Sequence, residues 1–348
     1  MESRKVQRLG PSTLAMTLPA AWARAQDVEK GDEVTVRESG KGTLTVTPTS
    51  ARDDESEATI HGESLDADAV ERAIVGQYVL GRRVIHVTAE GTLDSEHINA
   101  VYKAETQLMG LGVVEETPER ITIRCSVDPE DFTLDNLLKR LENTGSTMRG
   151  EAVEALATGD PNLAQRALNR ERQANKIFVL LLRLTFTAYE NPNLARAVGL
   201  DDGFPLIGYR SVAKNLELTA DNAEDIAEIV LEADGHTLDV DEATMRRIRE
   251  FTEQVDDLTA LAVRAVVERD YDLHVQCRKR FADVADLESE ILADIPEMEN
   301  DRLLRIRDVL VSLQQTAEFA MRNAEIAANL ALNEQSDHTT LADHTSEE

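Results

Sequence analysis

Cysteine and aromatic residues are scarce in this sequence. The chain of 348 residues has two cysteines, Cys125 and Cys277, which lie far apart and outside any CxxC pattern. This excludes a disulfide framework and a thiolate zinc site, and it fits a reducing cytoplasm. Aromatic residues make up 4% of the chain against 42% apolar residues. The cores must therefore be built from Ala, Leu, Val and Ile, as in helix bundles, and an all-β sandwich is not expected.

Long apolar runs and catalytic motifs are also missing. The longest apolar run, Ile177 to Leu182, ends at Arg183, and the first residues, MESRKVQR, have no apolar stretch. We therefore expect no signal peptide and no membrane insertion. The seven histidines are scattered, and HExxH, GxSxG and GxxxxGK[ST] do not occur. The sequence predicts a cytoplasmic protein that is not an enzyme.

Acidic residues dominate the charge, with 66 Asp and Glu against 37 Lys and Arg and a net charge of -29. A carboxylate surface of this density is typical of proteins that work in molar salt, and it predicts a halophilic archaeon as the source. The first fifty residues are the exception, with seven basic and six acidic side chains. A polyanion would be attracted to this region alone.

The N-terminal segment shows the alternation of short strands. Apolar and polar residues alternate from Ser12 to Leu18, Pro19 opens a short helix, and Val34/Val36 and Leu44/Val46 mark two strands around an SGKG turn. About fifty residues with so few apolar side chains cannot enclose a core, so we expect a second chain to complete it.

These residues resemble the AbrB/SpoVT swapped-hairpin family. The resemblance rests on RKVQRLG, STLAMTLPAAW, VEKGDEVTV and TLTVTP, which cover nearly all of Arg4 to Pro48. It implies that residues 1–50 form a homodimer whose hairpins interlace and contact the DNA backbone. The residues that map to this contact are Arg4, Lys5, Arg8 and Arg24. The alternative is that these charges only solubilise a dimerisation module.

A polar linker is predicted at residues 51–58, followed by an α+β segment at 59–128. In the segment, helix-like stretches at Asp66–Val79 and Ser95–Met109 alternate with strand-like stretches at Arg83–Val87, Val113–Glu116 and Arg120–Ser126. A small-molecule effector site in this segment is one hypothesis, although no glycine-rich or charged signature marks it.

Helical periodicity continues from residue 131 almost to the end of the chain. One stripe starts at Leu134, and Asp160 and Pro161 begin the next helix after a break at Gly159. The further helices are expected at approximately Asn162–Tyr189, Leu206–Ala233, Glu242–Val267, Leu273–Ala293 and Arg302–Leu332. The segment KNLELTADNAEDIAE from Lys214 aligns with QQTAEFAMRNAEIAA from Gln314, which indicates an internal repeat of three helices.

The repeat resembles the PhoU family, whose tandem three-helix bundles carry a signature of the form LERxxDxAxxIA. Here it reads LELTADNAEDIA from Leu216 to Ala227, and QYVLGRRVIHV and GLGVVEET resemble the insert of archaeal PhoU-like regulators. The resemblance implies a mainly α fold: an N-terminal hairpin domain, a small α+β segment and bundles at 131–235 and 239–333. The polar residues 334–348 are predicted to be disordered.

A metal site is a candidate function of the first bundle. Glu217 and Asp221 lie four residues apart, so both carboxylates project from one helix face, and Glu171 and Asn175 occupy the matching positions on the neighbouring helix. The PhoU resemblance implies a divalent cation at these four residues. The alternative is a solvated acidic face. In the second bundle Arg322 follows Glu318 where an acid is expected, which argues against a cation there.

Two functions follow from these resemblances. The first is a DNA-binding regulator of phosphate uptake and phosphate response, in which the bundles relay phosphate status. The second is a signalling adaptor that modulates a phosphate transporter ATPase or its regulator, with the hairpin domain used only for dimerisation. The sequence names neither the operator nor the effector.

Overall fold

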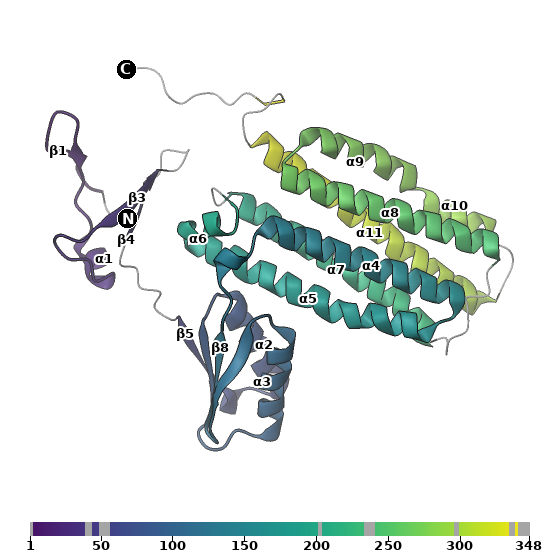
Figure 1. The fold of residues 1–348 in the computed structure, drawn as a ribbon, viewed down its shortest axis with the longest axis horizontal. Coiled ribbons are helices and arrows are strands. Elements are labelled where there is room, and N and C mark those ends of the chain that lie inside the picture. The colour runs from purple at the N-terminus through teal and green to yellow at the C-terminus, as the bar shows by residue number, and fades with distance from the viewer. Residues whose placement is uncertain are drawn as a thin grey trace. The chain divides into compact units, whose positions relative to one another are not determined.

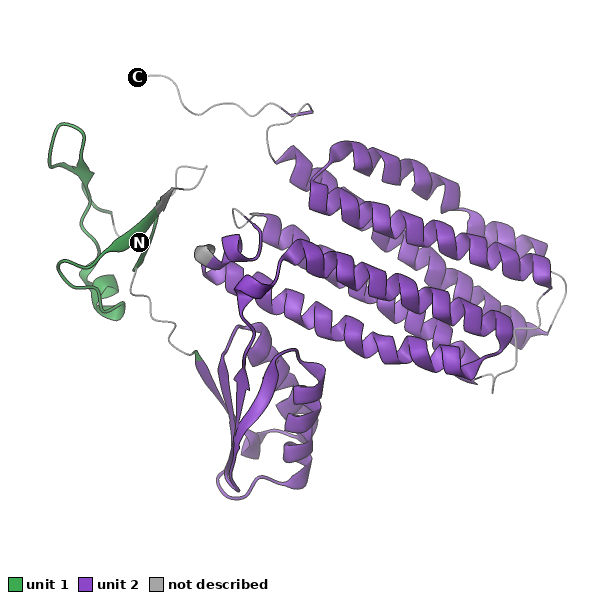
Figure 2. Ribbon diagram, viewed as in Figure 1, with its two compact units in different colours: residues 1–56 green, residues 57–348 purple. Residues whose placement is uncertain are grey.

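The computed structural model describes residues 3–38, 44–48, 56–200, 204–232, 241–295, 299–333 and 338–339. Within it the chain forms two compact units, residues 1–56 and residues 57–348 (Figure 2). The predicted linker lies largely outside the described residues, as do the SGKG turn and nearly all of the predicted disordered tail.

The first unit consists of two short hairpins and one short helix. Its elements are β1 (Gln7–Arg8), β2 (Leu14–Ala15), α1 (Ala20–Ala25), β3 (Val34–Glu38) and β4 (Leu44–Pro48). Strands β1 and β2 are antiparallel, as are β3 and β4. Among the side chains described in this unit, only that of Pro48 is buried. A single copy of the unit therefore has no enclosed core, as its composition predicts.

The second unit begins with an α+β segment (Figure 1). Its elements are β5 (Glu57–His61), α2 (Ala67–Val79), β6 (Val84–Thr88), α3 (Ser95–Gln107), β7 (Leu111–Glu116) and β8 (Arg120–Cys125), with short 3-10 turns at Gly62–Ser64 and Pro129–Asp131. The sheet order is β5-β6-β8-β7. Strands β5 and β6 are parallel, and β8 is antiparallel to both β6 and β7.

The two helices of the segment lie on one side of this sheet (Figure 1). Four fully buried branched side chains, Ile85, Val87, Ile121 and Ile123, form the centre of its core. Ile85 is paired with Ile123 and Val87 with Ile121, so all four point to the same face. On the opposite face the side chains of β6 and β8 are largely polar, because alternate residues of a strand point to opposite sides.

The rest of the unit is a set of long helices packed side by side (Figure 1). They are α4 (Leu134–Thr158), α5 (Pro161–Glu190), α6 (Pro192–Ala197), α7 (Phe204–Glu232), α8 (Glu242–Glu268), α9 (Tyr271–Val284), α10 (Leu287–Asp294) and α11 (Asn300–Leu332). Helices α4, α5 and α7 pack on one another, as do α8, α9 and α11. The predicted mainly α fold with tandem three-helix bundles is confirmed.

Local sequence explains where several helices begin and end. The Asp160 carboxylate accepts a hydrogen bond from the Asn162 amide at 2.8 Å, as its predicted capping role requires. Gly159 has φ 67°, the left-handed conformation that glycine adopts most easily, and it ends α4. Asp241 caps α8 in the same way, with 2.6 Å to the Thr244 amide.

The structure corrects three details of the predicted elements. The helix expected at Leu273–Ala293 is two helices, α9 and α10, separated after Val284. A short helix, α6, follows α5 where only a break was expected, and strand β5 begins at Glu57, inside the predicted linker. Both short elements are held by contacts with other parts of the chain. Helix α6 packs against α5, and strand β5 pairs in parallel with β6.

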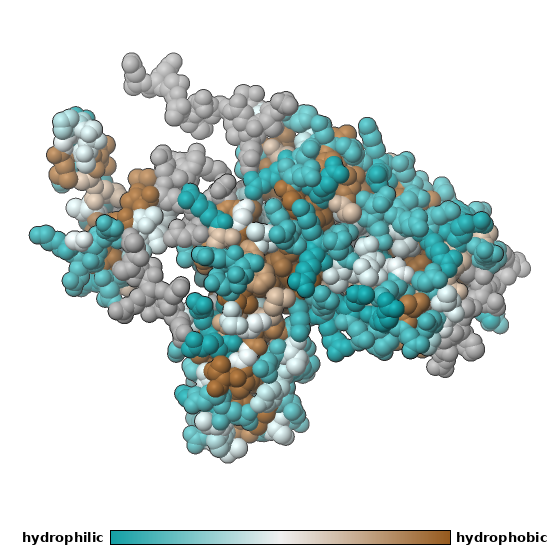
Figure 3. All heavy atoms as spheres, in the orientation of Figure 1, coloured by the Kyte–Doolittle hydropathy of each residue, from teal (hydrophilic) through white to brown (hydrophobic). Residues whose placement is uncertain are grey.

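Hydrophilic residues cover most of the visible face of the bundles (Figure 3). Among the helices of the described residues, none combines the length and apolar composition needed to cross a membrane. Buried alanines are frequent in the cores, including Ala213, Ala220, Ala223, Ala317, Ala320, Ala324 and Ala327 on α7 and α11. These small side chains let the two helices approach closely, which is how a chain poor in aromatic residues packs its interior.

Candidate functional site

The four predicted DNA-contacting residues lie on the surface of the first unit. Arg4 and Lys5 precede β1, Arg8 is its last residue, and Arg24 lies in the last turn of α1; all four are exposed. The Arg24 Nε donates to the Ala20 carbonyl oxygen at 3.2 Å, which orients this guanidinium along its helix. Exposed cationic side chains of this kind could contact phosphate groups.

The same unit exposes an unusual amount of apolar surface. Leu9 is 72% exposed, Leu14 is 65% exposed and Met16 is 53% exposed. Val6, Val36 and Leu44 are each more than half exposed as well. Isolated exposed side chains are common, but six in so small a unit form an apolar surface that a single copy leaves uncovered.

The predicted metal-binding residues lie on facing positions of α5 and α7. Glu171, Asn175, Glu217 and Asp221 are all partly buried. Burial raises the pKa of Glu171, and the charge of Glu217 raises it further, whereas Arg172 opposes the change. The carboxylates of Glu171 on α5 and Glu217 on α7 therefore act on one another.

The negative charge continues along α7 beyond the predicted residues. Burial raises the pKa of Asp221 to about 6, with further contributions from Glu217 and Glu171. The pKa of Glu224 is raised to about 7, first by burial and then by Glu171 and its neighbours on α7. We call Glu171, Glu217, Asp221, Glu224 and Asp225 the acidic face. Repulsion within it would be relieved by protons or by a cation.

A lysine partly compensates this face. The Lys214 ammonium contacts the Glu217 carboxylate one turn away on α7, and it lies 5.5 Å from the centre of the Phe178 ring on α5. In the described part of the chain, no three His, Cys, Asp or Glu side chains are arranged to hold a metal ion. The carboxylates fit a hard cation in their chemistry, but Lys214 competes with it for Glu217.

The second bundle has a different charge arrangement at the related position. The Arg322 guanidinium lies 3.9 Å from the Glu318 carboxylate and 5.1 Å from the centre of the Phe319 ring. Arg322 therefore pairs with Glu318. A cation at this position would be repelled by Arg322. In the first bundle the related residue is Asp221, which is acidic.

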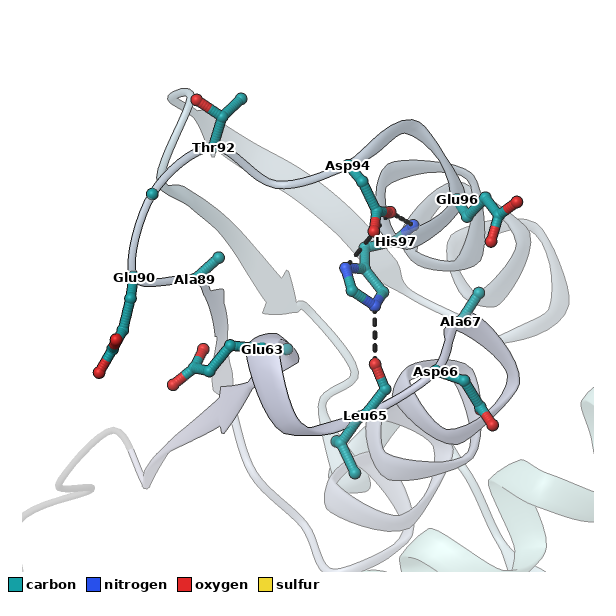
Figure 4. Close-up of a pocket in the computed structure, with 12 residues that line it drawn as sticks. Glu63, Leu65, Asp66, Ala67, Ala89, Glu90, Thr92, Asp94, Glu96 and His97 are labelled. Carbon is teal, nitrogen blue, oxygen red and sulfur yellow. Dashed lines mark hydrogen bonds and ion pairs between the residues drawn. The ribbon is translucent and has the colours of Figure 1, made fainter.

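An open pocket lies in the α+β segment (Figure 4). It has a volume of about 460 Å³ and is lined by residues that follow β5 and β6 and that begin α2 and α3. His97 lies at its base: Nε2 is 2.9 Å from the Leu65 carbonyl oxygen and Nδ1 is 3.3 Å from the Asp94 carboxylate. His97 thus joins the starts of the two helices.

The chemistry of this pocket does not favour phosphate. Asp66 accepts from the Ala69 amide at 2.7 Å, and Asp94 accepts from the His97 amide at 2.8 Å, so each helix start is capped by its own carboxylate. Glu63, Glu90 and Glu96 add further negative charge to the lining. An anion would meet repulsion from these carboxylates. The charged lining was not predicted, because its residues come from separate loops.

The comparisons with known proteins agree with both resemblances. The family described as "PhoU domain" matches residues 138–230, and the family described as "Antidote-toxin recognition MazE, bacterial antitoxin" matches residues 7–54. The chain contains a PhoU domain. The PhoU domain extends from α4 to the end of α7 and includes the acidic face, whereas the N-terminal unit is MazE/AbrB-like.

Two solved structures of PhoU proteins are similar to the chain. PhoU from Pseudomonas aeruginosa is 17% identical with a TM-score of 0.42, and the match covers 57% of this chain and 94% of that one. The phosphate transport system regulatory protein PhoU from Streptococcus pneumoniae is 15% identical with a TM-score of 0.45, and the match covers 59% and 96%. No curated protein matches the sequence.

The PhoU domain is joined to the α+β segment through a buried arginine that sequence reasoning did not single out. Arg183 on α5 is 4% exposed. Its guanidinium donates to the carbonyl oxygens of Tyr78 at 2.5 Å, Gly81 at 3.1 Å and Arg82 at 3.1 Å. These carbonyls lie at and just beyond the end of α2, where a positive charge is favoured. The only signal in the sequence is a charge at the end of an apolar run.

Proposed function

We propose that this protein is a cytoplasmic, DNA-binding transcription regulator of phosphate uptake and phosphate response. The N-terminal units of two chains would form one swapped-hairpin module that binds DNA. The PhoU-type bundles would relay phosphate status to it through contacts with partner proteins. The proposed function is non-catalytic. The observation that carries it is the combination of a PhoU domain with an N-terminal MazE/AbrB-like unit in one chain.

The charge distribution supports a role in DNA binding. Residues 1–50 have a net charge of +1, which leaves -30 for the remainder of the chain. Arg4, Lys5, Arg8 and Arg24 are exposed, so they could contact backbone phosphates without rearrangement of a core. Phosphate contacts of this kind give affinity and position but little sequence specificity. The acidic surface elsewhere would keep the nucleic acid away from the bundles.

Dimerisation is supported by the exposed apolar side chains of the same unit. A second copy that interlaced its hairpins would cover the surface of Leu9, Leu14 and Met16 and would pair open strand edges. Burial of apolar surface contributes about 25 cal/mol per Å², which makes such an interlaced dimer favourable. The same dimer would place two sets of the four basic residues on one module.

The PhoU domain equally supports the adaptor function, in which the chain modulates a phosphate transporter ATPase or its regulator. In that case the N-terminal unit would serve dimerisation alone. The two functions differ in one measurable property, since only the regulator must bind DNA at the salt concentration of the cell.

We also propose that the first bundle binds a divalent cation through Glu171, Asn175, Glu217 and Asp221. Burial raises the pKa of Glu171 and Asp221, and the neighbouring carboxylates raise it further, which supports this proposal because a cation would relieve that repulsion. A cation would supply charge neutralisation between α5 and α7. Binding would require Lys214 to release the Glu217 carboxylate. The ion pair between Lys214 and Glu217 would therefore lower the affinity for a cation.

The test of the proposed function is to sequence the DNA that co-purifies with the protein at high salt. A regulator should retain fragments enriched at a small number of sites, and replacement of Arg4, Lys5, Arg8 and Arg24 by alanine should remove them. Recovery of no DNA above the background of that variant, with the protein folded and dimeric, would support the adaptor function instead.

A further inference from the structure

The sheet of the α+β segment has two unlike edges. Strand β5 forms one edge and β7 the other, and in the part of the chain that the structure describes β5 pairs with β6 alone. Strand β7 has a register shift between Val113 and Glu115, and a bulge of this kind hinders further pairing. Strand β5 keeps a regular register along Glu57–His61 and contains no proline or lysine. Its outer edge is therefore open to another strand.

The two faces of β5 differ in polarity. Ile60 is buried in the core and is paired with Val87, which belongs to the same core. Glu57, Thr59 and His61 are exposed, and they point to the opposite face because side chains alternate along a strand. A strand that extends this sheet must therefore be apolar on the face that the helices cover and polar on the other. A second copy of β5 has this pattern.

A second copy of β5 is also complementary in its charges. In an antiparallel pair centred on Thr59, Glu57 of one copy lies opposite His61 of the other. In the same register Ala58 lies opposite Ile60. A carboxylate opposite an imidazole and two apolar side chains opposite each other both stabilise a strand pair. A shift by one residue would move Ile60 to the polar face, so the alternation excludes it.

The proposed dimer of the N-terminal units supplies the second copy, and the inference rests on that dimer. Strand β4 ends at Pro48 and β5 begins at Glu57, so nine residues of chain separate the two positions. This length spans at most about 30 Å. In an interlaced dimer two β5 strands are therefore tethered to one module, which gives them an effective concentration in the millimolar range. A short strand pair is then sufficient for association.

We propose that β5 of each chain pairs with β5 of a second copy, antiparallel and centred on Thr59. The pair joins two four-stranded sheets into one sheet of eight strands. Its two-fold axis is perpendicular to the sheet, so the helices of both copies cover the same face. Because Arg183 ties the α+β segment to the PhoU domain, this contact links the PhoU domains of the two chains as well.

Disulfide cross-linking of the full-length protein at molar salt tests the contact. Both native cysteines, Cys125 and Cys277, are buried, so an introduced surface thiol is the reactive one. Thr59→Cys places two thiols opposite each other, where the Cα atoms of an antiparallel pair lie about 4.5–5.5 Å apart, within the range that a disulfide spans. Val114→Cys, at an exposed position on β7, is the matched control. Thr59→Cys should cross-link at least about tenfold faster than this control.

The register is tested by coexpression of two further variants. Glu57→Cys and His61→Cys should cross-link with each other, because these positions lie opposite one another in the pair. Each variant alone should cross-link slowly, since its two thiols are four residues apart along the strands, or about 13 Å. This pattern distinguishes strand pairing from a loose collision of the two segments.

A charge reversal tests the complementarity of the pair. In the Thr59→Cys protein, His61→Glu places a carboxylate opposite Glu57 of the second copy, and the symmetry makes this happen twice. Like charges in directly opposite positions are unfavourable, so cross-linking should become slower by about threefold or more. Adding Glu57→Lys restores opposite charges and should restore the rate.

Sedimentation of the same full-length variants separates this inference from the proposed function. A dimer in which Thr59→Cys cross-links no faster than Val114→Cys would overturn the β5 contact and leave the N-terminal dimer standing. Glu57→Cys that cross-links with itself as fast as with His61→Cys, or a charge reversal that Glu57→Lys does not rescue, would overturn the register. A monomeric chain would overturn both proposals. The predicted cross-links in a protein that retains no DNA would support the contact together with the adaptor function.

Discussion

The guanidinium of Arg183 lies 4.8 Å from the centre of the Tyr78 ring while it donates a hydrogen bond to the Tyr78 carbonyl oxygen at 2.5 Å. The Tyr78 hydroxyl in turn donates to the Met109 carbonyl oxygen at 2.8 Å, beyond the end of α3. The three groups connect α5 of the PhoU domain with both helices of the α+β segment. These contacts tie the end of α2 to α5.

Arg183→Met should weaken the contact between α5 and the α+β segment. The substitution keeps much of the apolar stem but leaves three carbonyl oxygens without their donor, and it should lower the free energy of unfolding by about 1–3 kcal/mol. Urea denaturation would measure this. Arg172→Met, at an exposed position on the same helix, should change stability by less than about 0.5 kcal/mol. Equal effects of the two variants would contradict the structural role of Arg183.

The acidic face predicts a pH-dependent stability. Glu224 holds its proton up to about pH 7 in the folded state and releases it near 4.5 when unfolded. Its contribution to stability is therefore fully present below pH 4.5 and is lost as the pH rises to 7. Glu224→Gln should reduce the slope of the urea midpoint against pH in this window and should stabilise the protein at pH 8. Glu253→Gln, an exposed position on α8, should reproduce neither effect.

Metal binding can be tested by a contrast between the two bundles. A cation at the acidic face should stabilise the protein by about 2.7 kcal/mol at a hundredfold excess over its dissociation constant. Asp221→Asn should remove most of this gain. Glu318→Gln should matter little, since Arg322 already lies 3.9 Å from Glu318. Calorimetry that found no cation binding, or equal losses in both variants, would show that the acidic face is only a solvated surface.

Salt should stabilise the fold, because 66 acidic side chains repel one another. Dilution lengthens the screening distance from about 3 Å at 1 M to about 30 Å at 0.01 M, so this repulsion grows as salt is removed. The thermal midpoint should decrease steadily from molar to millimolar potassium chloride. A midpoint that stayed constant or rose on dilution would refute adaptation to a high-salt cytoplasm.

The sequence predicted those parts of the fold that depend on local pattern. In α5, α7, α8 and α11 apolar residues recur at helical spacing over many turns, which marks these segments as helices. Gly159 and Asp160 mark a helix boundary, because glycine readily ends a helix and aspartate caps the start of the next one. The break after Val284 has no proline or glycine to mark it, so two helices were predicted as one. Strand β5 is held by its parallel partner β6, and a contact between distant segments leaves no local signal.

In the candidate sites, too, residues close together in the sequence could be predicted, whereas contacts between distant residues could not. Glu217 and Asp221 could be placed on one helix face from their spacing, and Glu171 opposite them from the resemblance. The ion pair between Arg149 on α4 and Asp256 on α8 could not, because the residues are far apart in the sequence and each is an ordinary charge in a helical stripe. The pocket around His97 was also missed, since it is formed by loops that meet only in the folded segment.

The isolated segment Met1–Ser50 should dimerise at high salt. Leu14→Glu should weaken this dimer, because it places a charge on surface that a second copy would cover. A loss of 1.4 kcal/mol would raise the dissociation constant about tenfold. Sedimentation equilibrium measures both proteins. A folded monomer in the wild-type segment would contradict the swapped-hairpin arrangement.

The central claim, that the N-terminal unit binds DNA through its four basic residues, is tested most directly by the salt dependence of DNA affinity. Each phosphate contact should contribute about 0.9 to the slope of log K against log salt. Replacing Arg4, Lys5, Arg8 and Arg24 by alanine should reduce that slope by up to about 3.6 per chain and weaken binding to all sequences alike. A control that replaces the exposed bundle residues Arg172, Arg278, Arg302 and Arg307 should leave the slope unchanged, and it should not increase affinity, because it makes the bundles more negative. A slope that is equal in the wild type and the N-terminal variant would contradict the account.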